Sequence, residues 1–251
     1  MKKRVIFVLN TLAWMLLALS AITIIIQWVG LDSDLYYALQ MRENVPESAG
    51  ISKEDLRHLD RNLAFYLDGY YGSLDAAEDE SLVISVNGVM QPAFNEREIL
   101  HMKDCRHLFD LLDYVSIACR LLFWIVITCR LMLRLCCRTK QKMKVLPGPG
   151  SFWLGSAVIL LPLAVLALWA AIDFNSAFNF FHRILFTNDL WLLNPRTDLL
   201  IRICPQSMFA NMGLRIALLS AAVLLGLPLV ATILSLIFKK RKKDTNEIPQ
   251  I

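Results

Sequence analysis

Four long apolar stretches dominate this 251-residue sequence, and each is long enough to cross a lipid bilayer. They cover Val5 to Gly30, Tyr114 to Leu133, Phe152 to Ile172 and roughly Ile216 to Phe238. A bilayer core needs about 20 consecutive, mostly apolar residues in a helix. The 56% hydrophobic content fits membrane helices with a modest water-facing part. We therefore predict a predominantly α integral membrane protein with four transmembrane helices.

The basic residues predict the orientation of these helices. Clusters of Lys and Arg precede the first stretch, follow the second and follow the fourth, whereas residues 31–113 hold 17 acids against seven bases. Basic flanks stay in the cytoplasm, so both termini are expected inside. The predicted segments are transmembrane helix 1 (1–30), a small mixed α/β extracellular cap (31–113), helix 2 (114–135), a cytoplasmic loop (136–151), helix 3 (152–172), an aromatic outer-interface segment (173–215), helix 4 (216–238) and a basic tail (239–251).

Two of the predicted spans have competing interpretations. In the second, Arg120 and Arg130 bracket the apolar middle; they either lie along lipid and reach the interface or serve a buried function. The first contains Ala18-Leu19-Ser20, which loosely resembles a signal-peptide cleavage site. Another apolar run follows at once, and its length favours a retained anchor.

Local patterns in the cap predict helices and a hairpin. Ser52 and Asp55 resemble a capping box that precedes leucines at helical spacing. Leu82 to Val86, Asn87-Gly88 and Val89-Met90 are typical of a β-hairpin with a two-residue turn. A second helix is expected after Asn95, either ending in the cap or continuing into the membrane.

The segment 173–215 mixes aromatic and polar residues. Simple anchoring at the membrane interface explains the aromatic residues. Polar residues at the same depth instead favour a site for an amphiphilic ligand. Pro195 and Pro205 prevent one continuous helix there.

The four histidines are His58, His101, His107 and His182. Histidine titrates near neutral pH, which suits it to moving protons. His58 and His107 are expected on solvated helix surfaces. Glu98 and Asp104 flank His101 at helical spacing, so either acid could orient the imidazole; alternatively, Glu98 closes a capping box with Asn95. The charge pattern places His101 and His182 on the same side of the membrane.

Several other classes of site lack their motifs. The sequence has no GxSxG elbow, no HExxH motif and no glycine-rich phosphate loop, which argues against a serine hydrolase, a zincin or a nucleotide-binding protein. His101, Asp104 and His182 have no zinc-type spacing. We therefore expect no metal, no cofactor and no nucleic-acid partner. Cys105 and Cys204 could form a disulfide, although two free thiols are favoured.

Two blocks of the sequence resemble a known family. They read FNEREILHMKD at 94–104 and FHRILFTNDLWLLNP at 181–195, the second continuing to Pro205. Both are similar to the signature blocks of the lipoprotein intramolecular transacylases (Lit), whose four-span layout with an outer cap also matches. The resemblance covers nearly the whole chain. Cys105 stands where valine is expected in that family.

The resemblance implies an acyltransferase of the bacterial cell membrane, with its active site at the extracellular face. Such enzymes move the sn-2 acyl chain of a diacylglyceryl-modified lipoprotein to the α-amino group of its N-terminal cysteine, giving the lyso-form. The partners would be this lipoprotein N-terminus and membrane lipids. Catalytic roles fall on His101 and His182, as general base or acid and oxyanion stabiliser. The residues proposed to bind or orient the substrate are Glu98, Asp104, Phe186, Asn188, Asp189, Trp191, Asp198 and Arg202.

Three alternatives compete with the acyltransferase. A non-enzymatic membrane sensor or partner-binding protein explains the acidic cap, but not two interfacial histidines among aromatic residues. A metal-dependent hydrolase would need bound zinc. A transporter is disfavoured because the spans contain few charged residues and four helices leave little room for a pathway.

Overall fold

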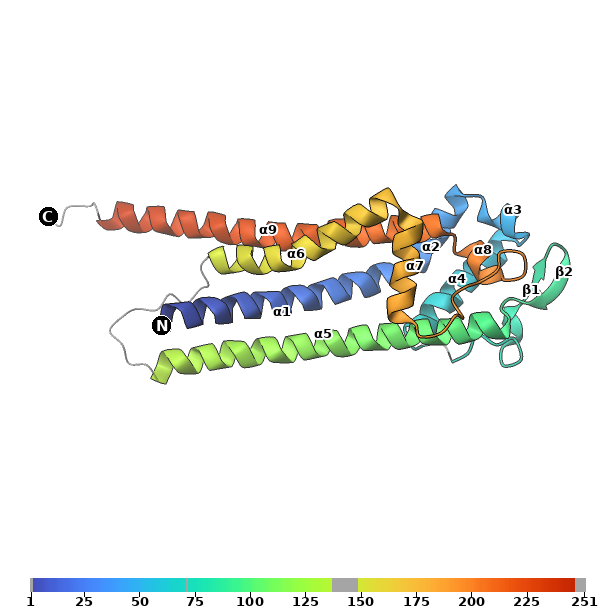
Figure 1. Ribbon diagram of the computed structural model, residues 1–251, viewed down its shortest axis with the longest axis horizontal. Helices are drawn as coiled ribbons and strands as arrows, with labels where there is room; N and C mark the ends of the chain where they lie inside the picture. Colours follow the sequence, from blue (N-terminus) through green and yellow to red (C-terminus); the bar gives the residue numbers. More distant parts are fainter. Residues whose placement is uncertain (1, 71, 137–148, 247–251) are drawn as a thin grey trace. The chain divides into compact units, whose positions relative to one another are not determined.

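The computed structural model describes residues 2–70, 72–136 and 149–246, and these are mostly helical (Figure 1). Within them, four helices are long and apolar enough to cross a membrane. These are α1 (Lys2–Gly30), α5 (Glu96–Cys136), α6 (Pro149–Ile172) and α9 (Gln206–Asn246). Together with a two-stranded hairpin, they confirm the predicted fold class. The predicted cytoplasmic loop and basic tail include residues 137–148 and 247–251, which lie outside the described residues.

Two of these helices extend well beyond their apolar stretches. Helix α5 has 41 residues, so the helix expected after Asn95 and the second apolar stretch form one continuous element. Helix α9 begins directly after Pro205, ten positions before Ile216. Proline restricts the residue before it to extended conformations, which explains why α9 starts there.

The chain divides into two compact units. The span unit comprises Met1–Ile24, Tyr114–Val165 and Ala217–Ile251, and the cap unit comprises Ile25–Asp113 and Leu166–Ile216. Both His101 and His182 therefore belong to the cap unit. The remaining elements of the cap unit are α2 (Ser33–Arg42), α3 (Val45–Ala49), α4 (Lys53–Leu67), a 3₁₀ turn (Glu80–Leu82), β1 (Val83–Val86), β2 (Val89–Pro92), α7 (Phe174–Leu185) and α8 (Leu199–Ile203).

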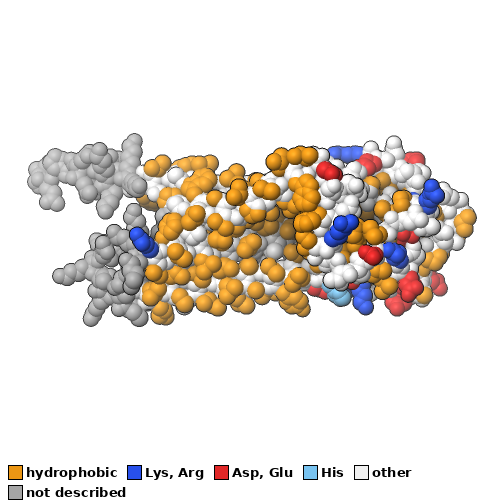
Figure 2. Space-filling view, in the orientation of Figure 1, with side chains coloured by type: hydrophobic (Ala, Val, Ile, Leu, Met, Phe, Trp, Pro, Cys, Tyr) orange, Lys and Arg blue, Asp and Glu red, His pale blue; other side chains and the backbone are white. Residues whose placement is uncertain are grey.

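In the span unit, small and polar side chains allow close helix contacts. Trp14 of α1 donates a hydrogen bond from Nε1 to Ser156 Oγ of α6 at 3.0 Å. A Cβ added at Gly155 would lie 2.7 Å from Trp14 Cδ1, so only glycine permits this approach. Small residues at helix contacts are typical of membrane proteins. On the face shown in Figure 2, the span unit carries many hydrophobic side chains and almost no charged ones.

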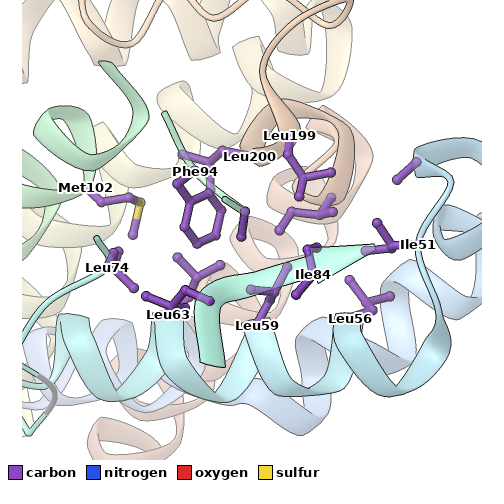
Figure 3. Close-up of a cluster of buried hydrophobic side chains, with 14 of the residues drawn as sticks. Ile51, Leu56, Leu59, Leu63, Leu74, Ile84, Phe94, Met102, Leu199 and Leu200 are labelled. Atoms are coloured by element: carbon purple, nitrogen blue, oxygen red, sulfur yellow. The ribbon is translucent and has the colours of Figure 1, made fainter. Parts of the chain in front are cut away.

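The cap unit has its own hydrophobic core (Figure 3). One face of α4 contributes Leu56, Leu59 and Leu63, which recur at helical spacing as the sequence predicts. Ile84 of β1 packs on this face. The same core contains Phe94, Met102, Leu199 and Leu200. Residues far apart in the sequence, at the start of α5 and in α8, are thus fixed to one framework.

The local predictions for the cap are confirmed. The side chain of Ser52 caps α4 by accepting a hydrogen bond from Asp55 N at 2.9 Å. The hairpin pairs Val86 with Val89 around Asn87 and Gly88, whose φ angles are 52° and 83°. Two consecutive positive φ angles are the signature of a type I′ turn, which asparagine and glycine favour.

Candidate active site

His101 lies in the second turn of α5, and the start of that helix is held on both sides. Asn95 and Glu98 form a reciprocal capping box: Glu98 N donates to Asn95 Oδ1 at 3.1 Å and Asn95 N donates to Glu98 Oε2 at 2.8 Å. This confirms the capping interpretation of Glu98. On the next position along the helix, Met102 is buried in the cap core. Together these contacts fix the direction in which His101 projects.

Glu98 also joins α5 to α8. Its second oxygen, Oε1, accepts a hydrogen bond from Leu200 N at 2.6 Å. Asn95 Nδ2 donates to Asp198 Oδ1 at 3.0 Å, and Asp198 Oδ2 accepts from Asn194 N at 2.7 Å. We call Asn95, Glu98 and Asp198 the polar clamp. Glu98 is 1% exposed. Its carboxylate accepts hydrogen bonds from two backbone N–H groups, those of Asn95 and Leu200, and within the described residues it makes none to the imidazole of His101.

The other charged residues of this region, Asp198 and Arg202, also make hydrogen bonds within the cap. Burial by itself raises the pKa of Asp198, but hydrogen bonds from Asn194 N–H, Thr197 and Asn95 outweigh it and hold the pKa below its usual value. Arg202 donates to the backbone oxygen of Ala49 at 3.3 Å. Of the residues proposed to contact substrate, Glu98, Asp198 and Arg202 therefore make their hydrogen bonds within the cap.

Replacing Glu98 by alanine should destabilise the cap unit strongly. The change leaves the N–H groups of Asn95 and Leu200 without their acceptor, and an unpaired buried N–H such as that of Leu200 costs about 1–3 kcal/mol. The thermal unfolding midpoint in detergent micelles should fall by several degrees. Glu96→Ala is the matched control, because Glu96 lies in the same helical turn but is exposed. Equal midpoints for the two variants would contradict the polar clamp.

His182 comes from α7, an amphipathic helix that begins at an Asp173 cap. Asp173 Oδ1 accepts a hydrogen bond from Ser176 N at 3.0 Å. Only Ala177 and His182 of this helix are buried. The imidazole Nδ1 of His182 lies 2.8 Å from the backbone oxygen of Phe178. A carbonyl oxygen only accepts, so Nδ1 of His182 carries the proton and Nε2 presents a lone pair.

The two histidines meet although they are far apart in the sequence. Their ring centroids are 6.2 Å apart, and each residue is 8% exposed. Phe186 contacts both rings, at 5.2 Å from His101 and 5.6 Å from His182. Trp191 lies 5.0 Å from His182, and Phe178 lies 4.1 Å from it. The fold therefore brings the two imidazole rings together among the side chains of Phe178, Phe186 and Trp191, which we call the aromatic enclosure.

Burial affects the protonation of this pair. Desolvation lowers the pKa of His182 below its ordinary value, although the hydrogen bond with the Phe178 oxygen partly opposes this. His182 is consequently neutral at pH 7, the form in which Nε2 accepts a proton. In His101, Nδ1 is buried with no hydrogen-bond partner among the described residues, while Nε2 lies 3.7 Å from Cys105 Sγ.

The loop after α7 closes one side of the pair. Asn188 Nδ2 donates to Asp104 Oδ2 at 2.8 Å, which links the loop to α5 one turn beyond His101. Trp191 Nε1 donates to the backbone oxygen of Asn188 at 3.0 Å. Arg97 donates to the backbone oxygen of Asp189. Asp104, like Glu98, makes no hydrogen bond to His101 in the described part of the chain.

The other two histidines lie away from the histidine pair, and Cys105 and Cys204 form no disulfide with each other. His107 is exposed, as predicted. His58 is half-buried and lies 3.4 Å from Asn62 Nδ2, so it is only partly solvated, because α4 packs against the cap core. Cys105 and Cys204 are free thiols. Across residues 2–70, 72–136 and 149–246, no three His, Cys, Asp or Glu side chains group as metal ligands.

Sequence reasoning missed three contributors to this site. The backbone oxygen of Phe178 fixes the tautomer of His182, and Asn179 and Arg183 line a cavity beside it. Phe178 is four positions before His182 and Asn179 is four positions before Arg183, the spacing of neighbours on one side of a helix. An amphipathic helix predicted at 174–185 would have found them.

Comparisons with known proteins identify the family and the fold of this chain. Residues 11–209 match the family model described as lipoprotein intramolecular transacylase Lit. The structure of the membrane-integral Lit from Bacillus cereus is 20% identical over 96% of this chain and 97% of that chain, with a TM-score of 0.66. Structures of two variants of that protein, with one histidine changed to arginine or alanine, give a TM-score of 0.63 at 20% identity. They cover 96% of this chain and 94% of theirs. A comparison with curated sequences gave no significant match.

Proposed function

Because this chain belongs to the lipoprotein intramolecular transacylase (Lit) family, it is a membrane acyltransferase, and we propose that it makes lyso-form lipoprotein. The sn-2 acyl chain of a diacylglyceryl-modified cysteine moves to the α-amino group of the same cysteine. The single observation that carries this proposal is the buried pair of His101 and His182, with ring centroids 6.2 Å apart. The charge pattern favours a site on the outer face of the bacterial cell membrane.

This reaction asks little of the enzyme beyond positioning and proton transfer. Donor ester and acceptor amine belong to one molecule, so neither a covalent enzyme intermediate nor a second substrate is needed. Holding them together can supply an effective molarity of roughly 10⁵–10⁸ M. The nitrogen–carbonyl bond forms and the carbonyl–glycerol oxygen bond breaks, while one proton moves from the amine to the glycerol oxygen.

His182 is the group we assign to that proton. Its Nδ1 donates to the Phe178 oxygen, so Nε2 is free to take the proton from the attacking amine and return it to the leaving glycerol oxygen. The Phe178 oxygen also stabilises the imidazolium that forms between these two steps. A positioned general base of this kind contributes about 10²–10⁴-fold.

His101 is the group we assign to the developing oxyanion. A thiol is a weak donor, and that of Cys105 lies 3.7 Å from His101 Nε2, which favours a proton on Nδ1. That nitrogen has no partner among the described residues and can therefore donate to the carbonyl oxygen of the ester. Since ring nitrogens hydrogen-bond at about 2.9 Å, one tetrahedral centre can contact both rings.

The aromatic enclosure has a protective role in this proposal. Water would compete with the amine and hydrolyse the ester, so the site must exclude it. Phe186 is buried and contacts both histidines, and Trp191 covers His182. These rings also provide an apolar surface for the glyceryl and acyl groups.

Expression of this chain in a bacterium that lacks a transacylase and makes diacylated lipoproteins tests the proposal. We expect conversion to N-acyl, S-monoacylglyceryl cysteine. Substrate and product have the same mass, so fragmentation by tandem mass spectrometry must place one acyl chain on nitrogen. The product should also resist labelling of its α-amino group.

The control for this experiment is the chain with both His101→Ala and His182→Ala, expressed to the same level in membranes. Unchanged lipoprotein in cells carrying the wild-type chain would overturn the proposed function. Full conversion by the double variant would overturn the assignment to the histidine pair.

A further inference from the structure

A polar cavity of about 280 Å³ opens beside the histidine pair in the cap unit. Phe186 and Trp191 line the side nearest His182. The polar part of its wall is formed by Asn179, Arg183, Thr187, Asn188 and Asp189. Helix α7 and the loop that follows it thus provide the whole of this side-chain set, which we call the polar cavity.

The polar cavity adjoins the site of the proposed reaction. Phe186 and Trp191 belong to its wall and contact the ring of His182 at 5.6 and 5.0 Å. Arg183 is the residue that follows His182 in α7. A group bound in the polar cavity therefore lies next to the group that receives the proton.

Two charged side chains of the polar cavity are available to a ligand. Arg183 and Asp189 are exposed, and within the described residues neither side chain makes a hydrogen bond or an ion pair. Asn179 donates to Asn175 Oδ1 at 3.2 Å, which leaves its own oxygen as an acceptor. The polar cavity thus offers donors and acceptors together.

This mixture fits a peptide backbone better than the other parts of the substrate. Each residue of a peptide carries one N–H donor and one C=O acceptor, which Asp189 and Arg183 can pair with. Acyl chains would leave these groups unpaired, and the volume is at the small end for ligand sites. A lipid phosphate would favour several cations without a neighbouring carboxylate such as Asp189.

We propose that the polar cavity binds the backbone of the first residues that follow the lipidated cysteine. This inference rests on the proposed function. An extended chain spans about 3.3–3.6 Å per residue, so two or three residues after the cysteine lie within about 10 Å of the reacting nitrogen. Holding them fixes the direction of the α-amine toward the ester, and backbone recognition allows lipoproteins of different sequence.

The test compares two substrates with purified protein in detergent micelles. One is the amide of S-(diacylglyceryl)cysteine, and the other carries four further residues. For Arg183→Ala and for Asp189→Asn, the ratio of kcat/KM for the longer over the shorter substrate should fall about tenfold, the scale expected for one lost hydrogen bond to a charged group. Arg196→Ala, an exposed position outside the polar cavity, should keep the wild-type ratio.

Other outcomes would show whether the peptide subsite or the proposed function is wrong. Equal losses with both substrates, an unchanged ratio, or a loss that appears only when phosphatidylglycerol is present in the micelle would each overturn the peptide subsite. Acyl transfer by the wild-type protein on the shorter substrate tests the proposed function separately. No transfer on either substrate would overturn the proposed function and this inference with it. Thermal unfolding of each variant checks that these surface changes leave the fold intact.

Discussion

Replacing His182 by alanine should lower the rate of lyso-lipoprotein formation by about 10²–10⁴-fold, the usual contribution of a positioned general base. The side chain is neutral at pH 7 because burial lowers its pKa. Its Nδ1 is committed to the Phe178 oxygen at 2.8 Å, so Nε2 is the nitrogen available to the amine. Timed conversion of a synthetic diacylated lipopeptide, followed by tandem mass spectrometry, measures the rate.

The matched control is His107→Ala, which removes an exposed histidine of the cap unit and should leave the rate unchanged. Alanine at position 182 also leaves a hole between the rings of Phe178 and Trp191. Added imidazole should occupy that hole and restore part of the rate, which a purely structural role for His182 would not permit. A rate within threefold of wild type, a change below the roughly 10²-fold lower limit, would contradict the assignment.

Much of the fold follows from short-range patterns in the sequence. Hydropathy identifies the four spans because each helix must satisfy its own backbone in lipid. Ser52 and Asn87-Gly88 predict a helix cap and a turn because their conformations are determined within a few residues. The capping role of Glu98 was one of two open interpretations, because Glu98 is three residues from both Asn95 and His101; the reciprocal hydrogen bonds with Asn95 decide it.

The candidate site was less accessible to such reasoning. His101 and His182 are 81 positions apart, and no periodic pattern in the sequence predicts that α5 and α7 bring their side chains into contact. Charge placed both histidines on one side of the membrane, but their contact depends on long-range packing. Met102 in the cap core and the hydrogen bond between Glu98 and Leu200 are long-range contacts of this kind, and they fix the start of α5 to the cap core and to α8. Glu98, which makes the second of these contacts, is one of the two acids that the sequence offered for orienting His101.

The ends of the long helices could also not be predicted from hydropathy alone. Apolar stretches mark where lipid is expected, not where a helix ends. Helices α5 and α9 both begin in the cap unit, ahead of their apolar stretches. The polar start of α5 is stabilised by the capping box of Asn95 and Glu98 and by the burial of Met102, which hydropathy does not detect. For α5, this continuation places His101 on a long helix, a more rigid support than a loop.

Replacing His101 by alanine should lower the rate by about 10²–10³-fold, the loss seen when one donor to an oxyanion is removed. The argument rests on His101 Nδ1, which is buried without a partner among the described residues while Nε2 faces the thiol of Cys105. An oxyanion needs only a donor, and a glutamine amide is also a donor. His101→Gln should therefore be about tenfold faster than His101→Ala, since one restored hydrogen bond is worth roughly that factor.

The same substitution at position 182 separates the two roles. An amide cannot take a proton from the attacking amine, so His182→Gln should be no faster than His182→Ala. Glutamine approximates the length of histidine at both positions, which makes each variant a control for the other in packing. If His182→Gln regained activity and His101→Gln did not, His101 would be the base and His182 the donor. Equal behaviour of the two glutamine variants would mean that the rings share one role, and the division of labour inferred from their hydrogen bonds would be wrong.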